Sequence, residues 1–241
     1  GDHGQPEHSG GDVENDRKND PSLGQRPTDF ARQQDAHPGV EGAAVAGTVV
    51  ACVEAHEAGA VEPHTGPGDH WHYRWNYKLF AAQGYVVVNV NYHGSSGFGH
   101  AFLDSITHRW GELELQDVEA ATDWLLKRPF ADGRRIFASG GSYGGFMVAW
   151  MNGHVPAGRY AAYICHAGCF DWTAMFADDA FSWHAKELGA FYWDKPEQVL
   201  KQSPHAFAGA MDTPTLVIHG AQDFRVPDCN GLAYYNTLKA R

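Results

Sequence analysis

The sequence predicts an α/β protein with a mostly parallel sheet and helices on both of its faces. Segments dense in β-branched and apolar residues alternate along the chain with segments that carry apolar residues at helical spacing. Such alternation is typical of parallel sheets, in which ligands bind at the carboxyl ends of the strands. The length of 241 residues fits one large domain, and a hydrophobic content of 43% is enough for a sizeable core.

The predicted strands are short segments rich in valine, isoleucine and aromatic residues. Tyr85 to Tyr92 has an unbroken apolar centre, which is typical of a strand buried on both faces of a parallel sheet. The other predicted strands are Gly47 to Val53, Arg135 to Ser139, Arg159 to Cys165 and Thr215 to His219.

The predicted helices are marked by apolar residues that recur every three or four positions. Leu113 to Lys127 is amphipathic, and Pro129 follows its end. Between the second and third strands the chain also contains a glycine-rich loop, Gly94 to Gly99. The other predicted helices are Trp71 to Gln83, the segment from Ser142 to about Asn152, and Asp228 to Lys239.

The chain divides by composition into a polar lead-in and the α/β domain. Residues 1–42 are rich in Gly, Asp, Asn, Gln and Pro without periodicity, which predicts a disordered segment or the remnant of another domain. Residues 43–241 form the predicted domain. Because the chain begins with Gly1 rather than Met and ends at Arg241 inside a predicted helix, we expect a piece of a longer protein, with the domain truncated at its C-terminus.

Composition excludes several classes of partner. A formal charge of -11 disfavours nucleic acid and anionic membranes, and no apolar run approaches the roughly 20 residues that span a bilayer. The cysteines match no disulfide framework or zinc pattern, so we expect reduced thiols, two of them buried near a strand end, Cys165 and Cys169. The cytoplasm and the periplasm both stay open as compartments, with the cytoplasm favoured.

The strongest motif is Gly140-Gly141-Ser142-Tyr143-Gly144. A predicted strand precedes it and an apolar helix follows, which is the context of a nucleophile elbow in an α/β-hydrolase fold. A sharp turn there exposes the serine hydroxyl to a base. The backbone N–H of Tyr143, at the helix N-terminus, points at a substrate oxyanion. A glycine-rich turn with a chance serine is the alternative, and the flanking strand and helix argue against it.

A second motif follows the last predicted strand. The segment Leu216–Asp223 delivers Asp223 just past the carboxyl edge of the sheet, downstream of Ser142. The acid of an α/β-hydrolase triad lies at this point, where it orients a histidine and stabilises its charged form. An ordinary turn aspartate is the alternative.

A third motif is the turn His64-Thr65-Gly66-Pro67, which follows the first predicted strand. A tight Gly-Pro turn at this place can supply a second backbone N–H to an oxyanion hole. A plain surface turn explains the same residues equally well.

These three motifs together resemble the catalytic domain of the prolyl oligopeptidase family. The resemblance also includes Asn91-Tyr92-x-Gly94-Ser95-x-Gly97-Phe98-Gly99 and the run from His219 to Pro227, and it extends from about Pro63 to Arg241. It is strongest to bacterial dipeptidyl and acylaminoacyl peptidases. Members are serine peptidases with an α/β-hydrolase domain, usually preceded by a β-propeller that restricts access to short peptides.

Matched position by position, the resemblance implies that Ser142 is the nucleophile and Asp223 the triad acid. Arg225 matches a residue that binds a substrate carbonyl, a task that suits a guanidinium with several donors. The positions of the oxyanion hole are Tyr143 and Gly66. The positions that line the pocket for the residue before the scissile bond, where core packing is an equally good explanation, are Phe170, Trp172 and Phe176.

The sequence departs from the family pattern in two places. Thr65 stands where the family usually has a second glycine. The family's catalytic histidine lies a few tens of residues beyond the acid, but none of the 15 histidines follows Asp223 before the chain ends at Arg241. We therefore expect an incomplete triad in this chain, and the loss of one triad member costs several orders of magnitude in rate.

The sequence leaves three functions open. The first is a serine peptidase that hydrolyses short peptides through an acyl-enzyme on Ser142. The second is a carboxylesterase on the same fold, and the third is an inactive fragment or binding domain that lacks the histidine. No cofactor and no metal are expected, since His70-x-His72 lacks a third ligand. A short peptide is the expected partner, without nucleic acid or membrane, and the oligomeric state stays undetermined.

Overall fold

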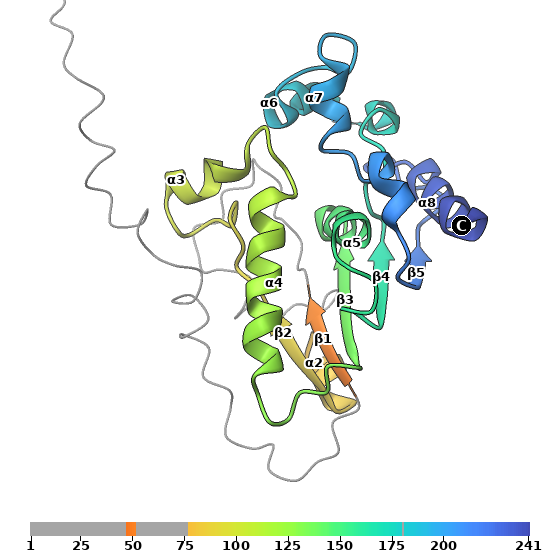
Figure 1. Cartoon of the computed structure of the whole chain (residues 1–241). Coiled ribbons are helices and arrows are strands. Elements are labelled where there is room, and N and C mark those ends of the chain that lie inside the picture. The colour runs from red at the N-terminus through yellow and green to blue at the C-terminus, as the bar shows by residue number, and fades with distance from the viewer. Residues whose placement is uncertain (1–46, 52–76, 180) are drawn as a thin grey trace, which may run out of the picture. The chain divides into compact units, whose positions relative to one another are not determined.

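The computed structural model describes residues 47–51, 77–179 and 181–241, which belong to one compact unit, Ala36–Arg241 (Figure 1). The predicted lead-in over residues 1–42 lies outside the described residues, and so does the predicted oxyanion turn with Gly66. Among the described helices, none is both long and apolar enough to cross a bilayer.

Five strands form a parallel sheet in the order β2-β1-β3-β4-β5, as the alternation of elements predicts. Each described strand lies inside or within two residues of a predicted one. The strands are β1 (Gly47–Ala51), β2 (Tyr85–Asn89), β3 (Ile136–Gly141), β4 (Ala162–His166) and β5 (Thr215–Ile218).

The strand order reverses between β1 and β3. From β1 the chain runs to β2 on one side, and it then returns to β3 on the other side of β1. In parallel sheets a crevice opens outside the carboxyl ends of the strands at such a switch point. The carboxyl end of β3 leads directly into Ser142, so the topology places the candidate nucleophile at this switch point.

The predicted burial of Tyr85 to Tyr92 on both faces is wrong for the strand itself, although Val90 and Tyr92 just after it are buried. β2 ends at Asn89, and each of its residues is only half-buried. The reason is its position, because β2 is an outer strand of the described sheet, whereas β3 lies inside the sheet and is mostly buried.

Three long helices match their predicted bounds to within two residues: α4 (Glu112–Leu126), α5 (Tyr143–His154) and α8 (Cys229–Ala240). Within the predicted helix Trp71 to Gln83, the described part contains α2 (Tyr77–Ala82). The short helices without a sequence prediction are α3 (His100–Leu103), η5 (Asp104–Ile106), η6 (Ala174–Ala177), η7 (Phe181–Trp183), α6 (His184–Leu188), α7 (Pro196–Leu200) and η8 (Pro204–Ala210).

The core is built around α5. Every residue from 143 to 152 is buried, and the helix packs on β3 and β4 (Figure 1). A helix that is apolar on all sides belongs in the interior. Beside it, Cys165 and Cys169 are buried free thiols, as predicted, and burial raises the pKa of Cys165 to about 12. The helix that carries the candidate nucleophile at its start is therefore the most enclosed of the long helices.

Candidate active site

Ser142 lies at the turn between β3 and α5 with φ 56° and ψ −115°. A non-glycine residue in such a conformation stores about 1–3 kcal/mol of strain and requires support from its surroundings. The support comes from the Ser142 N–H, which donates to the His166 carbonyl at 2.9 Å, and from the Phe146 N–H, which donates to the Ser142 carbonyl at 3.0 Å. Ser142 is partly exposed between the buried Gly141 and Tyr143. The turn has the geometry expected of a nucleophile elbow.

Two glycines make this turn possible because their neighbours leave no room for a side chain. A Cβ atom at Gly140 would lie 2.3 Å from the backbone of Gly144, one turn into the helix. A Cβ atom at Gly145 would lie 2.6 Å from the Cα of Gly168, in the loop after β4. Both contacts are with backbone, which cannot move aside, so strand, helix and loop meet at a distance that requires glycine.

The register of the sheet brings the motif regions to one edge. Gly141 pairs with His166, and His166 pairs with Ile218, so the last residues of three neighbouring strands lie in one row. Ser142 follows directly after this row, and Asp223 follows in the loop after β5. In Figure 1 the arrows of β3, β4 and β5 all point toward this edge.

The loop that carries Asp223 is held by its own backbone. The Asp223 Oδ1 accepts the N–H groups of Arg225 at 3.0 Å and Val226 at 2.9 Å. The Val226 carbonyl in turn accepts a hydrogen bond from His219 Nε2 at 2.8 Å. Among the described residues, the nearest basic nitrogen to the second oxygen, Oδ2, is His219 Nε2 at 3.9 Å. One carboxylate oxygen is thus used by the loop, and the other is left to accept a hydrogen bond from a histidine.

His219 packs against α8. Its side chain is only 8% exposed, and a Cβ atom at Gly231 would lie 2.5 Å from its Nδ1. Through its bond to the Val226 carbonyl, this histidine braces the acid loop. Within the described part of the chain, no histidine forms a hydrogen bond with the Ser142 hydroxyl.

Tyr143 begins α5, and its backbone N–H has no acceptor among the described residues. The first N–H groups of a helix lack intrahelical partners and carry partial positive charge, which suits them to a developing oxyanion. The phenol is buried and donates to the carboxyl of Glu114. Tyr143 therefore has the arrangement required of an oxyanion donor, whereas Gly66, the second predicted donor, is not described.

Arg225 lies on the surface beside Asp179. The Arg225 Nε is 3.0 Å from Asp179 Oδ1, and the Asp179 N–H donates to the Phe224 carbonyl at 3.1 Å. Nearly half of the Arg225 side chain is exposed, so its guanidinium can reach a ligand at the edge of the sheet.

Two of the three aromatic residues predicted to line a pocket fill the core. Trp172 is 2% exposed, and its indole N–H donates to the Gln202 carbonyl at 2.8 Å. Phe170 is 3% exposed and stacks on Tyr234 with ring centroids 4.8 Å apart. Phe176 alone of the three is half-buried rather than buried. Its ring lies in contact with aromatic side chains that are well exposed, namely Phe181, Tyr192 and Trp193.

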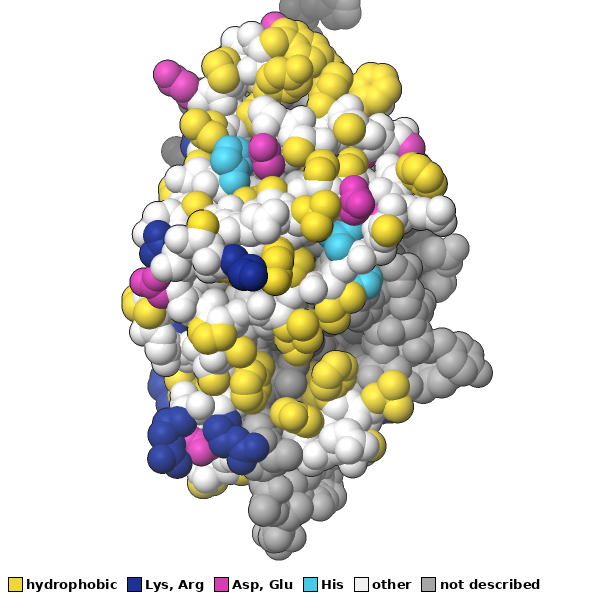
Figure 2. All heavy atoms as spheres, turned by 90° about the vertical axis from the view of Figure 1, so that its right-hand side faces the viewer, with side chains coloured by type: hydrophobic (Ala, Val, Ile, Leu, Met, Phe, Trp, Pro, Cys, Tyr) yellow, Lys and Arg dark blue, Asp and Glu magenta, His cyan; other side chains and the backbone are white. Residues whose placement is uncertain are grey.

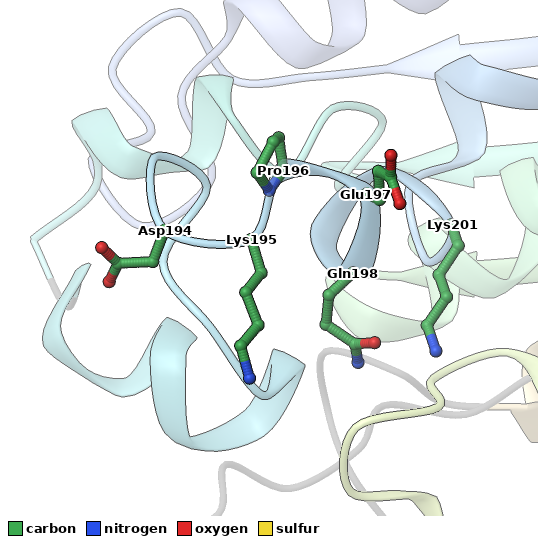
Figure 3. Close-up of a pocket in the computed structure, with 6 residues that line it drawn as sticks. All are labelled: Asp194, Lys195, Pro196, Glu197, Gln198 and Lys201. Carbon is green, nitrogen blue, oxygen red and sulfur yellow. The ribbon is translucent and has the colours of Figure 1, made fainter.

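A surface hollow of about 520 Å³ lies apart from these residues, at α7 (Figure 3). Lys195, Gln198 and Lys201 extend to the same side of it, while Asp194 points away. Its lining comes from one local segment and contains none of the predicted site residues, so it is not the candidate active site. In the described residues, no group of three or more potential ligands could hold a metal ion.

Two residues near the site have no counterpart in the sequence prediction. In the sequence Glu114 is one residue of the predicted helix Leu113 to Lys127, and Asp179 belongs to no motif. The signal for Glu114 is its spacing from Gly111, because a glutamate three residues after the N-cap residue can accept that residue's N–H. No local pattern could have found Asp179, because its partner Arg225 is far along the chain.

Residues 71–241 match the model of the prolyl oligopeptidase family. The chain belongs to the prolyl oligopeptidase family. Among solved structures, the acylaminoacyl peptidase of Pyrococcus horikoshii is 29% identical with a TM-score of 0.68, over 83% of this chain and 31% of that one. The family and this likeness confirm the predicted α/β-hydrolase fold.

Two curated relatives are dipeptidyl-peptidase 5 from Porphyromonas gingivalis and from Schizosaccharomyces pombe. The first is 38% identical over 184 residues and the second 34% identical over 188 residues. The matches cover 74% and 75% of this chain, and 27% of each relative. The chain thus spans about a quarter of the length of these relatives.

Proposed function

We propose that the protein to which this chain belongs is a serine-type peptidase that hydrolyses short peptides through an acyl-enzyme on Ser142. The observation that carries the proposal is the conformation of Ser142, partly exposed at a strained strand-to-helix turn. The relatives named dipeptidyl-peptidase and acylaminoacyl peptidase support a substrate of the dipeptide or acyl-aminoacyl class.

In this mechanism the Ser142 hydroxyl attacks the scissile carbonyl while a histidine takes its proton. No histidine of the described residues is hydrogen-bonded to that hydroxyl, and we propose that the base comes from a part of the protein outside them. Asp223 orients it through Oδ2, since Oδ1 is occupied by the loop N–H groups. The histidine then protonates the leaving amine, and water hydrolyses the acyl-enzyme by the reverse sequence of proton transfers.

The oxyanion of the tetrahedral intermediate is held by the Tyr143 N–H at the start of α5. We further propose that Gly66 supplies a second N–H. Arg225 binds a carbonyl of the substrate on the amino-terminal side of the scissile bond, and Phe176 contacts the adjacent side chain. These roles follow from the family resemblance, from the exposure of Arg225 and from the partial exposure of Phe176.

A fluorophosphonate probe tests the nucleophile directly. We expect stoichiometric labelling of the full-length protein at Ser142, and complete loss of labelling and of peptide hydrolysis in Ser142→Ala. Ser203→Ala is the matched control, because that hydroxyl is buried and bonded to the Trp172 N–H and His205. Labelling that survives Ser142→Ala would contradict the proposal.

The reaction class requires a second measurement, because an elbow serves esters and amides alike. A dipeptidyl p-nitroanilide and a p-nitrophenyl ester are compared with the same full-length protein. A peptidase cleaves the anilide, and its kcat/KM falls when the amino-terminal residue of the substrate is removed. Ester cleavage without anilide cleavage would instead identify a carboxylesterase.

A further inference from the structure

Glu114 is a fully buried carboxyl in the first turn of α4, and α4 packs against α5. The Gly111 N–H donates to both of its oxygens at 3.2 Å, and the Tyr143 hydroxyl donates to Oε1. Burial raises the pKa of this carboxyl to about 7. In the described segments it forms no ion pair with a lysine or arginine.

Capping of α4 explains only one of these contacts. A glutamate at the third helical position often accepts the N–H of the N-cap residue, here Gly111. That role requires neither burial nor a bond to a tyrosine, and Glu112 in the same turn is exposed. Burying a carboxyl without a cation is costly, so the Tyr143 bond calls for a separate explanation.

The ring of Tyr143 is enclosed by other aromatic side chains. Tyr92 stacks on it with ring centroids 6.3 Å apart, and Trp110 contacts it edge-on at 4.8 Å. The ring of Phe146 lies 5.1 Å away. These contacts restrain the ring laterally, while Glu114 holds its far end. Because the same Cα carries the ring and joins the N–H next to Ser142, a shift of the ring shifts that N–H.

We propose that Glu114 is a positioning residue, which binds the Tyr143 hydroxyl and thereby fixes the backbone N–H that holds the oxyanion. The inference rests on the proposed function. An oxyanion donor acts more strongly in the transition state than in the substrate complex, so a displaced Tyr143 N–H lowers kcat and has little effect on KM.

The test compares four variants of the full-length protein, with kcat expressed per active site titrated by the fluorophosphonate probe. Glu114→Ala and Tyr143→Phe each lower kcat about ten- to a hundredfold and change KM less than about twofold. Glu114→Gln retains most of kcat, because its amide oxygen still accepts from Tyr143. Glu112→Gln, an exposed glutamate of the same helical turn, behaves as the unchanged protein.

A double variant separates positioning from helix capping. If Glu114 acts through the phenol, Glu114→Ala lowers kcat no further in a Tyr143→Phe background. If it only caps α4, Glu114→Ala lowers thermal stability in both backgrounds and leaves kcat per site unchanged, which overturns the inference. Should Glu114→Ala fail to fold, Tyr143→Phe decides alone, and an unchanged kcat overturns the inference.

The same experiments distinguish this inference from the proposed function. If hydrolysis persists in Ser142→Ala, Ser142 is not the nucleophile, and both proposals are wrong. If hydrolysis depends on Ser142 but kcat is unchanged in Tyr143→Phe and Glu114→Ala, the proposed function stands. Only the positioning role of Glu114 is then wrong.

Discussion

At the scale of single residues, the site depends on places where no side chain fits. A Cβ atom at Gly140 would overlap the backbone of Gly144, so strand and helix approach each other this closely only because residue 140 is glycine. The strained Ser142 lies between these two glycines. The strained conformation of Ser142 therefore depends on the lack of a Cβ atom at Gly140.

Gly140→Ala should separate β3 from α5. A Cβ atom placed 2.3 Å from backbone forces a shift that costs about 1–3 kcal/mol, and the shift displaces Ser142 directly. We expect a lower Tm and a rate of fluorophosphonate labelling reduced at least about tenfold. Gly209→Ala is the control, since nothing lies within 4 Å of its added atom. Equal labelling rates in the two variants would contradict this account of the turn.

The raised pKa of Glu114 predicts a specific dependence of stability on pH. The group binds its proton more tightly when folded, so its contribution is complete below about pH 4.5 and is lost as pH rises through about 7. The shift from 4.5 to about 7 corresponds to roughly 3 kcal/mol. The carboxyl of Asp117, which pairs with His93, also raises this pKa by charge repulsion.

Urea unfolding of the chain and of Glu114→Gln at pH 5, 6, 7 and 8 measures this dependence. The free energy of unfolding of the unchanged chain, relative to the variant, should fall from pH 5 to pH 7 and level off towards pH 8. Glu112→Gln removes an exposed glutamate of the same helical turn and serves as the reference variant. A constant difference for Glu114→Gln would show that burial does not raise the pKa of this carboxyl.

At the scale of elements, two neighbouring aspartates join the segment after η6 to the rest of the site. Asp178 is buried and lies 3.0 Å from His184 at the start of α6. Asp179 is exposed and holds Arg225. Burial is the main cause that raises the pKa of Cys169, and the negative charges of Asp178 and Asp223 add to this effect. This segment and the acid loop therefore converge on the chain that follows β4.

Asp179→Asn should weaken substrate binding through Arg225. An exposed ion pair is worth about 0.2–1 kcal/mol, so we expect KM for a dipeptidyl anilide to rise up to about fivefold with kcat unchanged. Asp194→Asn removes the same charge from an exposed position outside the acid loop and should leave KM unchanged. The effect should also disappear in an Arg225→Met background. An equal rise of KM in that background would show that Asp179 acts by another route.

The elements differ in how far the sequence determines them. The strands β3 and β5 and the helices α4, α5 and α8 are marked by local periodicity, and the order of their motifs suffices to predict Ser142 and Asp223 near one edge. The segment from Ala174 to Ala210 has no such periodicity, because its short helices are fixed by contacts between distant residues. The Trp172 indole bonded to Gln202 is one example. Residue type alone also could not show whether Trp172 is buried in the core or lines a pocket, because an aromatic side chain suits both places.

At the scale of the whole unit, β5 is an outer strand of the described sheet with one covered and one open face. Thr215 and Val217 are half-buried, and the Thr215 hydroxyl lies 3.4 Å from the Tyr234 hydroxyl of α8. Leu216 and Ile218 point to the other face and are 56% and 44% exposed. Figure 2 shows hydrophobic side chains spread over this side of the molecule. Outer strands with apolar open faces tend to associate.

The 241-residue chain alone should therefore associate with itself through β5 at micromolar concentration. Leu216→Lys introduces a charge on the open face of the strand and should reduce the associated fraction in size-exclusion chromatography with light scattering. Leu200→Lys is the matched control, because that leucine is 47% exposed but lies on α7. If both variants reduce association equally, the effect comes from net charge, and β5 is not the surface through which the chain associates.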